Sequence, residues 1–279
     1  MIIDAHAHAA GRYSSAESIR DVAKQHGIGK IVLCPSPKNN VNLKEPPNFP
    51  FLKSPGSIYL LNRMMRLATG SLKDFGDGNK YVYELKRQIP GLIIQFLWVN
   101  PLDPFQMACL ETNLREYEIK GLKLHQVWDP FAIDGNEFNQ LAEIARANHL
   151  PIFIHLYSEK ETRKLLRFAG SHRDVTFIVA HMLGLNIFEE RHNDLSNVYF
   201  DTSGSERVRE TDILEAIHLF GHDHVVFGSD TPYARLEDQI NKIDRLGLPD
   251  QVKECIFKLN IENILSLAAH PAVYKDAEA

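Results

Sequence analysis

The sequence predicts an α/β fold, a (β/α)8 TIM barrel with a long lid-like insertion after the second strand. The length of 279 residues fits one barrel of about 250 residues with an insertion. Short apolar runs alternate with helical segments, which indicates βαβ units and a parallel sheet. No glycine-rich phosphate loop follows the first run, which weighs against an open dinucleotide-binding sheet. We therefore expect a single domain over residues 1–279.

The predicted strands are short apolar runs that end at turn residues or at an ionisable side chain. In chain order they cover Met1–His8, Lys30–Cys34, Leu92–Val99, Lys120–His125, Pro151–His155, Val175–His181, Asn197–Asp201 and Val225–Asp230. The helical segments between and after them cover Ser14–His26, Tyr81–Gln88, Phe105–Tyr117, Glu137–Asn148, Glu159–Phe168, Thr211–Phe220, Leu236–Leu246 and Gln251–Leu267. Eight such strands favour a closed barrel.

Residues 36–79 interrupt this alternation with a run of prolines and asparagines. Segments this long in compact domains are usually functional lids or disordered. We interpret this one as a lid that determines substrate specificity, with a helix over Ser57–Leu67 inside it. Its apolar part, Ile58–Leu61, leaves open a homo-oligomer in which the lid packs on a second subunit.

Composition and charge describe an ordinary globular protein. Hydrophobic residues make up 44% and charged residues 24%, and the net charge is −5. The negative charge argues against nucleic acid or an anionic membrane as a partner. The sequence has neither a transmembrane run nor a secretory leader pattern, so we expect a cytoplasmic protein. Cys34, Cys109 and Cys255 are too scattered for a disulfide framework.

The first strand carries the most informative pattern, an HxH pair. Side chains alternate along a strand, so Asp4, His6 and His8 point to the same side. Two imidazoles two residues apart can bind one divalent cation.

Ionisable residues also end several later strands. Catalytic groups of a (β/α)8 barrel lie at the carboxyl ends of its strands. The residues in this position are His6, His8, His125, His155, His181, Asp201 and Asp230. Nitrogen and oxygen ligands without thiolate suit zinc, manganese or iron. The sequence therefore predicts a metal site at this end of the barrel.

Five motifs occur in the order of a known family. They are Asp4-Ala5-His6-Ala7-His8, Gly121-Leu122-Lys123-Leu124-His125, Ile154-His155, Val179-Ala180-His181-Met182-Leu183-Gly184 and Phe227-Gly228-Ser229-Asp230-Thr231-Pro232. Together they resemble the amidohydrolase superfamily, and within it the amidohydrolase-related group of metal-dependent hydrolases and decarboxylases. The resemblance spans all eight predicted strands.

The resemblance implies a ligand set for one divalent metal ion, zinc first and manganese second. The implied ligands are His6, His8, His155 and Asp230. Asp230 would also contact the metal-bound water, and His181 would be the proton-transfer residue beside it or a ligand for a second metal. A neutral imidazole suits acid–base work near pH 7.

Lys123 leaves two interpretations open. Binuclear members of the superfamily carry a carboxylated lysine on the fourth strand, whereas the amidohydrolase-related group has a lysine there and uses one metal. We favour one metal, with Lys123 structural or facing the substrate. The role of His125 stays open. The residues that we expect to bind substrate are Lys123, His125, Tyr157, Arg207 and Tyr233, because an arginine in such a loop could hold a carboxylate with two hydrogen bonds.

We thus predict an enzyme acting on a small molecule, a metal-dependent hydrolase that directs hydroxide at an amide or lactone. The alternative is a metal-dependent decarboxylase (a lyase) of a small unsaturated or aromatic acid, for which the same ligand set would serve. A second alternative is a metal-independent, lactonase-like or non-catalytic relative.

Overall fold

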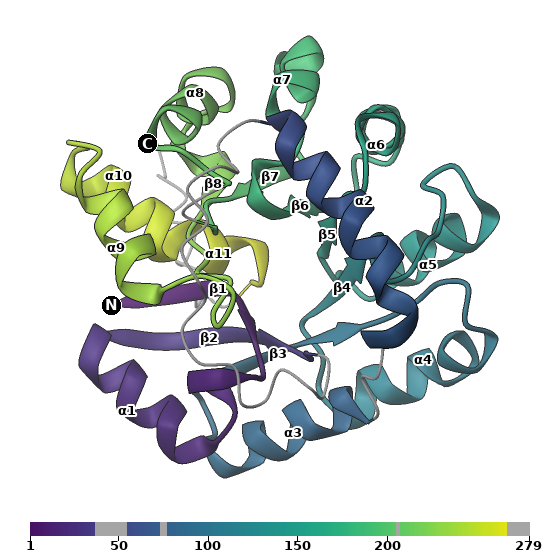
Figure 1. Cartoon of the computed structure of the whole chain (residues 1–279), viewed down its shortest axis with the longest axis horizontal. Coiled ribbons are helices and arrows are strands. Elements are labelled where there is room, and N and C mark those ends of the chain that lie inside the picture. Colours follow the sequence, from purple (N-terminus) through teal and green to yellow (C-terminus); the bar gives the residue numbers. More distant parts are fainter. Residues whose placement is uncertain (37–54, 73–76, 205–206, 267–279) are drawn as a thin grey trace, which may run out of the picture.

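The computed structural model describes residues 1–36, 55–72, 77–204 and 207–266. Eight parallel strands lie side by side in chain order and form a barrel surrounded by helices (Figure 1). The strands are β1 (Ile2–His8), β2 (Ile28–Cys34), β3 (Ile93–Trp98), β4 (Gly121–His125), β5 (Ile152–His155), β6 (Phe177–Val179), β7 (Val198–Asp201) and β8 (Val225–Val226). The predicted (β/α)8 barrel is confirmed.

The barrel closes between β8 and β1 through scattered hydrogen bonds. The Ala5 amide donates to the Phe227 carbonyl at 2.9 Å, and the Asp230 amide donates to the His6 carbonyl at 2.7 Å. An isolated bridge joins Ala7 to Thr231 beyond them. The seam therefore runs directly beside the two histidines of β1.

Helices cover the outside of the barrel. They are α1 (Ala16–His26), α3 (Gly78–Gln88), α4 (Pro104–Glu116), α5 (Asn136–Ala147), α6 (Glu159–Ser171), the short α7 (Leu185–Phe188), α8 (Glu210–Phe220), α9 (Leu236–Asp244), α10 (Asp250–Glu254) and α11 (Asn260–Ile264). Local signals set their ends. The Ser15 hydroxyl accepts from the Ser18 amide at the start of α1, and Gly27 ends that helix with a φ of 67°.

Two apolar clusters stabilise the barrel. The larger one joins one face of the strands to the surrounding helices. The smaller one contains side chains such as Val32, Phe96 and Ile178 from the opposite strand face. Ile261 and Leu265, near the last described residue, also belong to it. The alternation of side chains along each strand thus separates barrel interior from barrel surface.

Two predicted strand ends are wrong for a common reason, a local change of backbone geometry. β6 stops at Val179, and β8 stops at Val226. His181 and Asp230, which we had placed inside these strands, have φ angles of 55° and 58°, so the chain has already left the extended conformation. The predicted final helix is present as α10, a π-helical turn over Cys255–Leu259 and α11, which follow one another without a gap.

The segment predicted as a lid contains a helix, α2 (Pro55–Leu72), which is longer than expected. Residues 37–54 and 73–76 of that segment lie outside the described residues. In Figure 1, α2 crosses the view near β5, and its Asn62 amide donates to the carbonyls of Leu156 and Tyr157, which follow β5. Leu60 of the apolar part is 58% exposed. The lid function and the oligomer stay predictions.

Among the residues described, no helix combines the length and the hydrophobicity that crossing a membrane requires.

Lys242 of α9 connects the outer helices to the loop after β7. It is buried, and its amino group donates to the carbonyls of Thr202 and Val208 at 2.6 and 3.3 Å and to Gln239 Oε1 at 2.8 Å. Burial lowers the pKa of Lys242 to about 7, although Asp201 acts in the opposite direction. The loop between Thr202 and Val208 is therefore attached at both ends to one buried side chain.

Lys242 should make stability depend on pH. The unfolded chain keeps the lysine proton to higher pH than the folded protein does, so stability rises as pH increases above the folded pKa. We expect the difference in unfolding free energy between wild type and Lys242→Met to increase by about 2 kcal/mol from pH 7 to pH 9 in favour of wild type. Urea titrations at both values measure it. Equal pH dependence in the two proteins would contradict a depressed lysine pKa.

Candidate metal centre and active site

One pocket opens at the carboxyl ends of the strands. His6 and His8 come from β1, and Lys123 and His125 from β4. His155 ends β5, and the loops after β6, β7 and β8 carry the remaining polar groups. The lining residues are His6, His8, Met65, Trp98, Lys123, His125, Trp128, His155, His181, Arg207, Asp230 and Tyr233. The position predicted for the active site is therefore where the ionisable side chains gather.

Three of the predicted metal ligands converge on one point. Asp230 Oδ1 lies 3.5 Å from His6 Nε2 and 3.4 Å from His8 Nε2. One donor atom from each of these buried residues lies within 4.8 Å of the others. Two imidazole nitrogens and one carboxylate oxygen are a ligand set that zinc and manganese accept.

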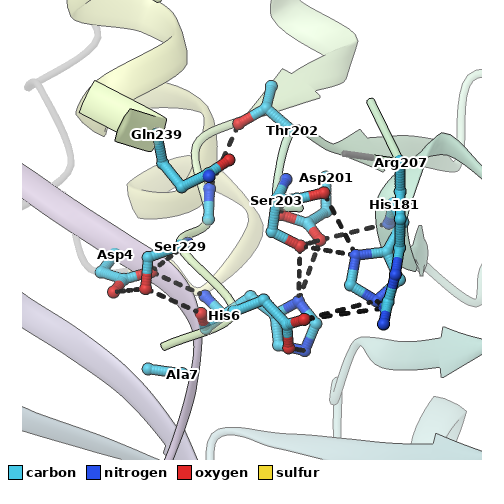
Figure 2. Close-up of polar contacts among 12 residues, drawn as sticks. Asp4, His6, Ala7, His181, Asp201, Thr202, Ser203, Arg207, Ser229 and Gln239 are labelled. Carbon is cyan, nitrogen blue, oxygen red and sulfur yellow. Dashed lines mark hydrogen bonds and ion pairs between the residues drawn. The ribbon is translucent and has the colours of Figure 1, made fainter. Parts of the chain in front are cut away.

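Hydrogen bonds fix the orientation of the His6 ring. Its Nδ1 lies 2.9 Å from Asp201 Oδ2 and 3.0 Å from Ser203 Oγ (Figure 2). On the other side, Lys123 Nζ lies 2.7 Å from Nε2. With the amine donating to Nε2, the proton of the neutral ring sits on Nδ1 and is donated to Asp201. A carboxylate behind the ring is the arrangement that holds a metal-binding histidine in the correct tautomer.

Gly228 makes room for this arrangement. A Cβ at position 228 would lie 2.1 Å from Asp201 Oδ1 and 2.7 Å from His6 Cβ. Only glycine therefore allows the chain leaving β8 to pass behind His6 while Asp201 keeps its contact.

The surroundings of His8 favour a positive charge at its ring. Its Nδ1 donates to the Pro35 carbonyl at 2.9 Å, so Nε2 faces Asp230. Burial acts to lower the pKa of His8, but Cys34 and Asp230 outweigh it and raise the pKa to about 10. A proton or a metal ion can supply a positive charge between Asp230 Oδ1 and the Nε2 atoms of His6 and His8. The residues present thus fit a divalent cation.

His155, the fourth predicted ligand, lies in the pocket but outside this cluster of three. Its Nε2 lies 3.2 Å from Asn62 Oδ1 of α2. Its ring stacks on His125 with centroids 3.9 Å apart. Burial, followed by repulsion from Arg207, lowers the pKa of His155 well below the ordinary value. His155 is therefore a neutral imidazole, as a ligand must be, and its coordination stays a prediction.

His181 is placed by the turn after β6. Its amide donates to Asp201 Oδ2 at 3.3 Å, and its Nδ1 lies 3.2 Å from the Ser203 carbonyl. Nε2 faces the pocket, where Arg207 Nη1 is 3.1 Å away and Asp230 Oδ2 is 3.9 Å away. Burial and the Arg207 charge lower the pKa of His181 far below its ordinary value. Nε2 of a neutral His181 can accept a hydrogen bond, and it can gain a proton when an anion offsets the Arg207 charge.

The pocket also holds two cationic side chains and a wall of rings. Lys123 is fully buried with its amino group 4.1 Å from the centre of the Phe153 ring, and burial lowers its pKa. Arg207 Nη1 lies 3.7 Å from Asp230 Oδ2. The His125 ring stacks on Trp98 at 5.5 Å, and its buried Nδ1 has no hydrogen-bond partner among the described residues. Such a site suits a flat, anionic molecule.

Of the substrate-binding predictions, Tyr157 alone lies outside the lining residues. The Arg66 guanidinium stacks over the Tyr157 ring at 3.4 Å. Tyr233 lines the pocket, with its ring edge against His8 and its hydroxyl 2.6 Å from Ser36 Oγ.

The sequence pattern does not identify Met65 and Trp98 as pocket residues, or Asn62 as a contact of His155. Nothing in their local sequence marks them, because Asn62 and Met65 belong to a helix within the insertion and Trp98 ends an apolar strand. Ser203 was also missed, although it lies two residues beyond Asp201, which we had placed among the strand-end groups.

Comparisons with known proteins agree with the fold. The family model for amidohydrolases matches residues 67–267. A search of curated protein sequences gave no match.

Solved structures of similar fold include a dihydroxybenzoic acid decarboxylase from Polaromonas sp. JS666 with bound manganese and 2-nitroresorcinol. It is 18% identical, with a TM-score of 0.63, and 91% of this chain and 87% of that chain are covered. A 5-carboxyvanillate decarboxylase from Novosphingobium aromaticivorans, also with manganese, is 19% identical, with a TM-score of 0.62 and coverage of 88% and 80%. A 4-oxalomesaconate hydratase from Rhodopseudomonas palustris is 14% identical, with a TM-score of 0.64 and coverage of 95% and 96%.

The Asp201 contact behind His6 should control metal affinity. Asp201→Asn leaves one oxygen to accept from His6, His181 and Ser203, so the His6 tautomer is no longer fixed. We expect Mn²⁺ or Zn²⁺ to bind about 10- to 100-fold more weakly, measured by calorimetric titration. Asp129→Asn is the matched control, because this equally buried acid accepts from Trp98 Nε1 away from the cluster. Equal affinities for Asp201→Asn and the control would contradict the role given to Asp201.

Proposed function

Because this chain belongs to the amidohydrolase family, we propose that it is a metal-dependent decarboxylase of a small aromatic or unsaturated carboxylic acid. The observation that carries the proposal is the presence of two side-chain cations, Lys123 beside His6 and Arg207 beside His181, in a pocket that Trp98 and Trp128 also line. The decarboxylases of similar fold add support for the reaction type.

His6, His8 and Asp230 would hold one divalent ion, with His155 as a further ligand, and the donor types suit zinc or manganese. When bound, the ion would hold and polarise polar groups of the substrate. Asp201 keeps the His6 nitrogen available by accepting from Nδ1, and the Pro35 carbonyl does the same for His8.

Arg207 is suited to bind the substrate carboxylate. A guanidinium can form two parallel hydrogen bonds to a carboxylate, and Arg207 extends into the pocket from the loop after β7. Its position next to His181 puts the carboxylate beside the proton-transfer residue. Trp98 and Trp128 supply apolar faces for a planar ring and exclude water from it.

His181 would move the proton that the reaction needs. Binding of the substrate carboxylate offsets the positive charge of Arg207, and His181 then takes a proton from solvent at Nε2. The bond between the carboxylate and the adjacent carbon then breaks, carbon dioxide leaves, and the electron pair stays on that carbon. The proton passes from Nε2 to the carbon, and His181 returns to its neutral form. One proton is consumed for each molecule of carbon dioxide released.

Hydrolysis, our first prediction from the sequence, becomes the second candidate. The neutral His181 favours it, because an accepting imidazole can also take the proton of an attacking water. The acceptor nitrogen serves either reaction, whereas two cations beside it fit a carboxylate better than a neutral amide or lactone.

A substrate screen separates the two reactions. We expect carbon dioxide release from at least one hydroxylated aromatic or unsaturated acid, with one deuteron from heavy water at the carbon that lost the carboxylate. Mass spectrometry measures both. Cleavage of amides or lactones with oxygen taken up from labelled water, and no carbon dioxide from any acid, would contradict the proposal and favour the hydrolase.

Arg207→Met tests the carboxylate contact. Loss of a charge-assisted hydrogen bond should raise KM for the acid by about 10- to 100-fold. Arg209→Met is the control, because Arg209 belongs to the same loop but is half exposed and pairs with Asp212. Steady-state kinetics of the two variants measures the difference. An Arg207→Met enzyme with the KM of the control would rule out the contact.

A further inference from the structure

We propose that Asp4 and Ser229 are positioning residues that hold the Asp230 carboxylate against His6 and His8, so that the affinity of the site for metal depends on both. This inference rests on the metal site of the proposed function and not on the reaction catalysed there. Neither residue lines the pocket among the described residues, so each acts through its neighbours.

Asp4 joins the two segments that carry the ligands. Its carboxylate is fully buried. Oδ1 accepts from the Ser229 amide at 2.9 Å and from the His6 amide at 3.2 Å, and Oδ2 accepts from Ser229 Oγ at 2.6 Å. Figure 2 shows Asp4 and Ser229 facing each other beside the His6 backbone. One side chain therefore contacts both β1 and the chain that follows β8.

Ser229 extends this connection to the far side of Asp230. Its hydroxyl oxygen accepts from the Thr231 amide at 3.0 Å. The Asp230 amide itself donates to the His6 carbonyl at 2.7 Å. The amides of three consecutive residues, from Ser229 to Thr231, are thus bound to Asp4, His6 and Ser229.

The backbone of Asp230 needs such support. Its φ of 58° lies in the left-handed region, which a residue with a Cβ rarely adopts unless its surroundings enforce it. Regular pairing cannot enforce it, because β8 already ends at Val226. The bonds from Asp4 and Ser229 replace the missing ladder and determine where the Asp230 carboxylate points.

The experiment is a titration with Mn²⁺, and separately with Zn²⁺, of the purified full-length protein and its variants by calorimetry. We expect Asp4→Ala and Ser229→Ala each to weaken binding about tenfold or more. The double variant should bind no more weakly than the weaker single one, because the two side chains act as one unit.

Asp4→Asn should restore most of the affinity. The asparagine Oδ1 can accept from both backbone amides, and its Nδ2 can donate to Ser229 Oγ. This rescue separates positioning through specific hydrogen bonds from a loss of core packing, and thermal unfolding checks each fold. If Asp4→Ala does not fold, Ser229→Ala and Asp4→Asn carry the comparison. Ser14→Ala is the control, because the Ser14 hydroxyl donates to the Gly11 carbonyl within the turn after β1.

Wild-type affinity in folded Ser229→Ala or Asp4→Ala would overturn the inference, as would an Asp4→Asn protein as weak as Asp4→Ala. A wild-type protein that binds neither ion would also overturn it. Absence of carbon dioxide release from every acid tested would contradict the proposed reaction alone, because the readout here is binding.

Discussion

The approach of two histidine nitrogens to one buried carboxylate oxygen is the constraint on which the rest of the site depends. Asp230 Oδ1 lies 3.5 Å from His6 Nε2 and 3.4 Å from His8 Nε2. Buried charges of this kind are unfavourable unless they are paired and hydrogen-bonded. The surrounding residues meet that requirement, because the outer nitrogen of each ring has an oxygen acceptor and the Asp230 backbone is bound on both sides.

The other charged side chains of the pocket orient its histidines and influence their protonation. Asp201 lies behind His6 and His181 and contacts both, so one buried carboxylate orients a ligand and the proton-transfer residue together. Lys123 and Arg207 approach the same histidines from the pocket side. Burial, followed by these positive charges, lowers the pKa values of His155 and His181 and keeps the rings neutral. Neutral imidazoles beside two cations are suited to receive an anionic substrate.

The sequence predicts most of the strands and most of the ionisable side chains at their ends, because both depend on local residue patterns. Apolar runs ending in His6, His125, His155 and Asp201 marked strands and their carboxyl ends, since strand periodicity and barrel geometry are both visible in the pattern of residues. What could not be predicted depends on contacts between distant segments. Asn62 meets His155 only because α2 packs near the end of β5. The residue pattern around His181 and Asp230 predicts strand. The left-handed turns found there are enforced by bonds from Asp201, Asp4 and His6, which lie far away in the sequence and leave no local signal.

Anomalous diffraction at the manganese absorption edge, from a crystal grown with Mn²⁺, would locate the bound ion. We expect one peak per chain, at coordination distance from His6 Nε2, His8 Nε2 and Asp230 Oδ1, and no peak in an Asp230→Asn crystal. A single peak elsewhere, or one that persists in Asp230→Asn, would contradict this expectation. Two adjacent peaks bridged by a modified Lys123 would contradict the single-ion site and establish the binuclear alternative.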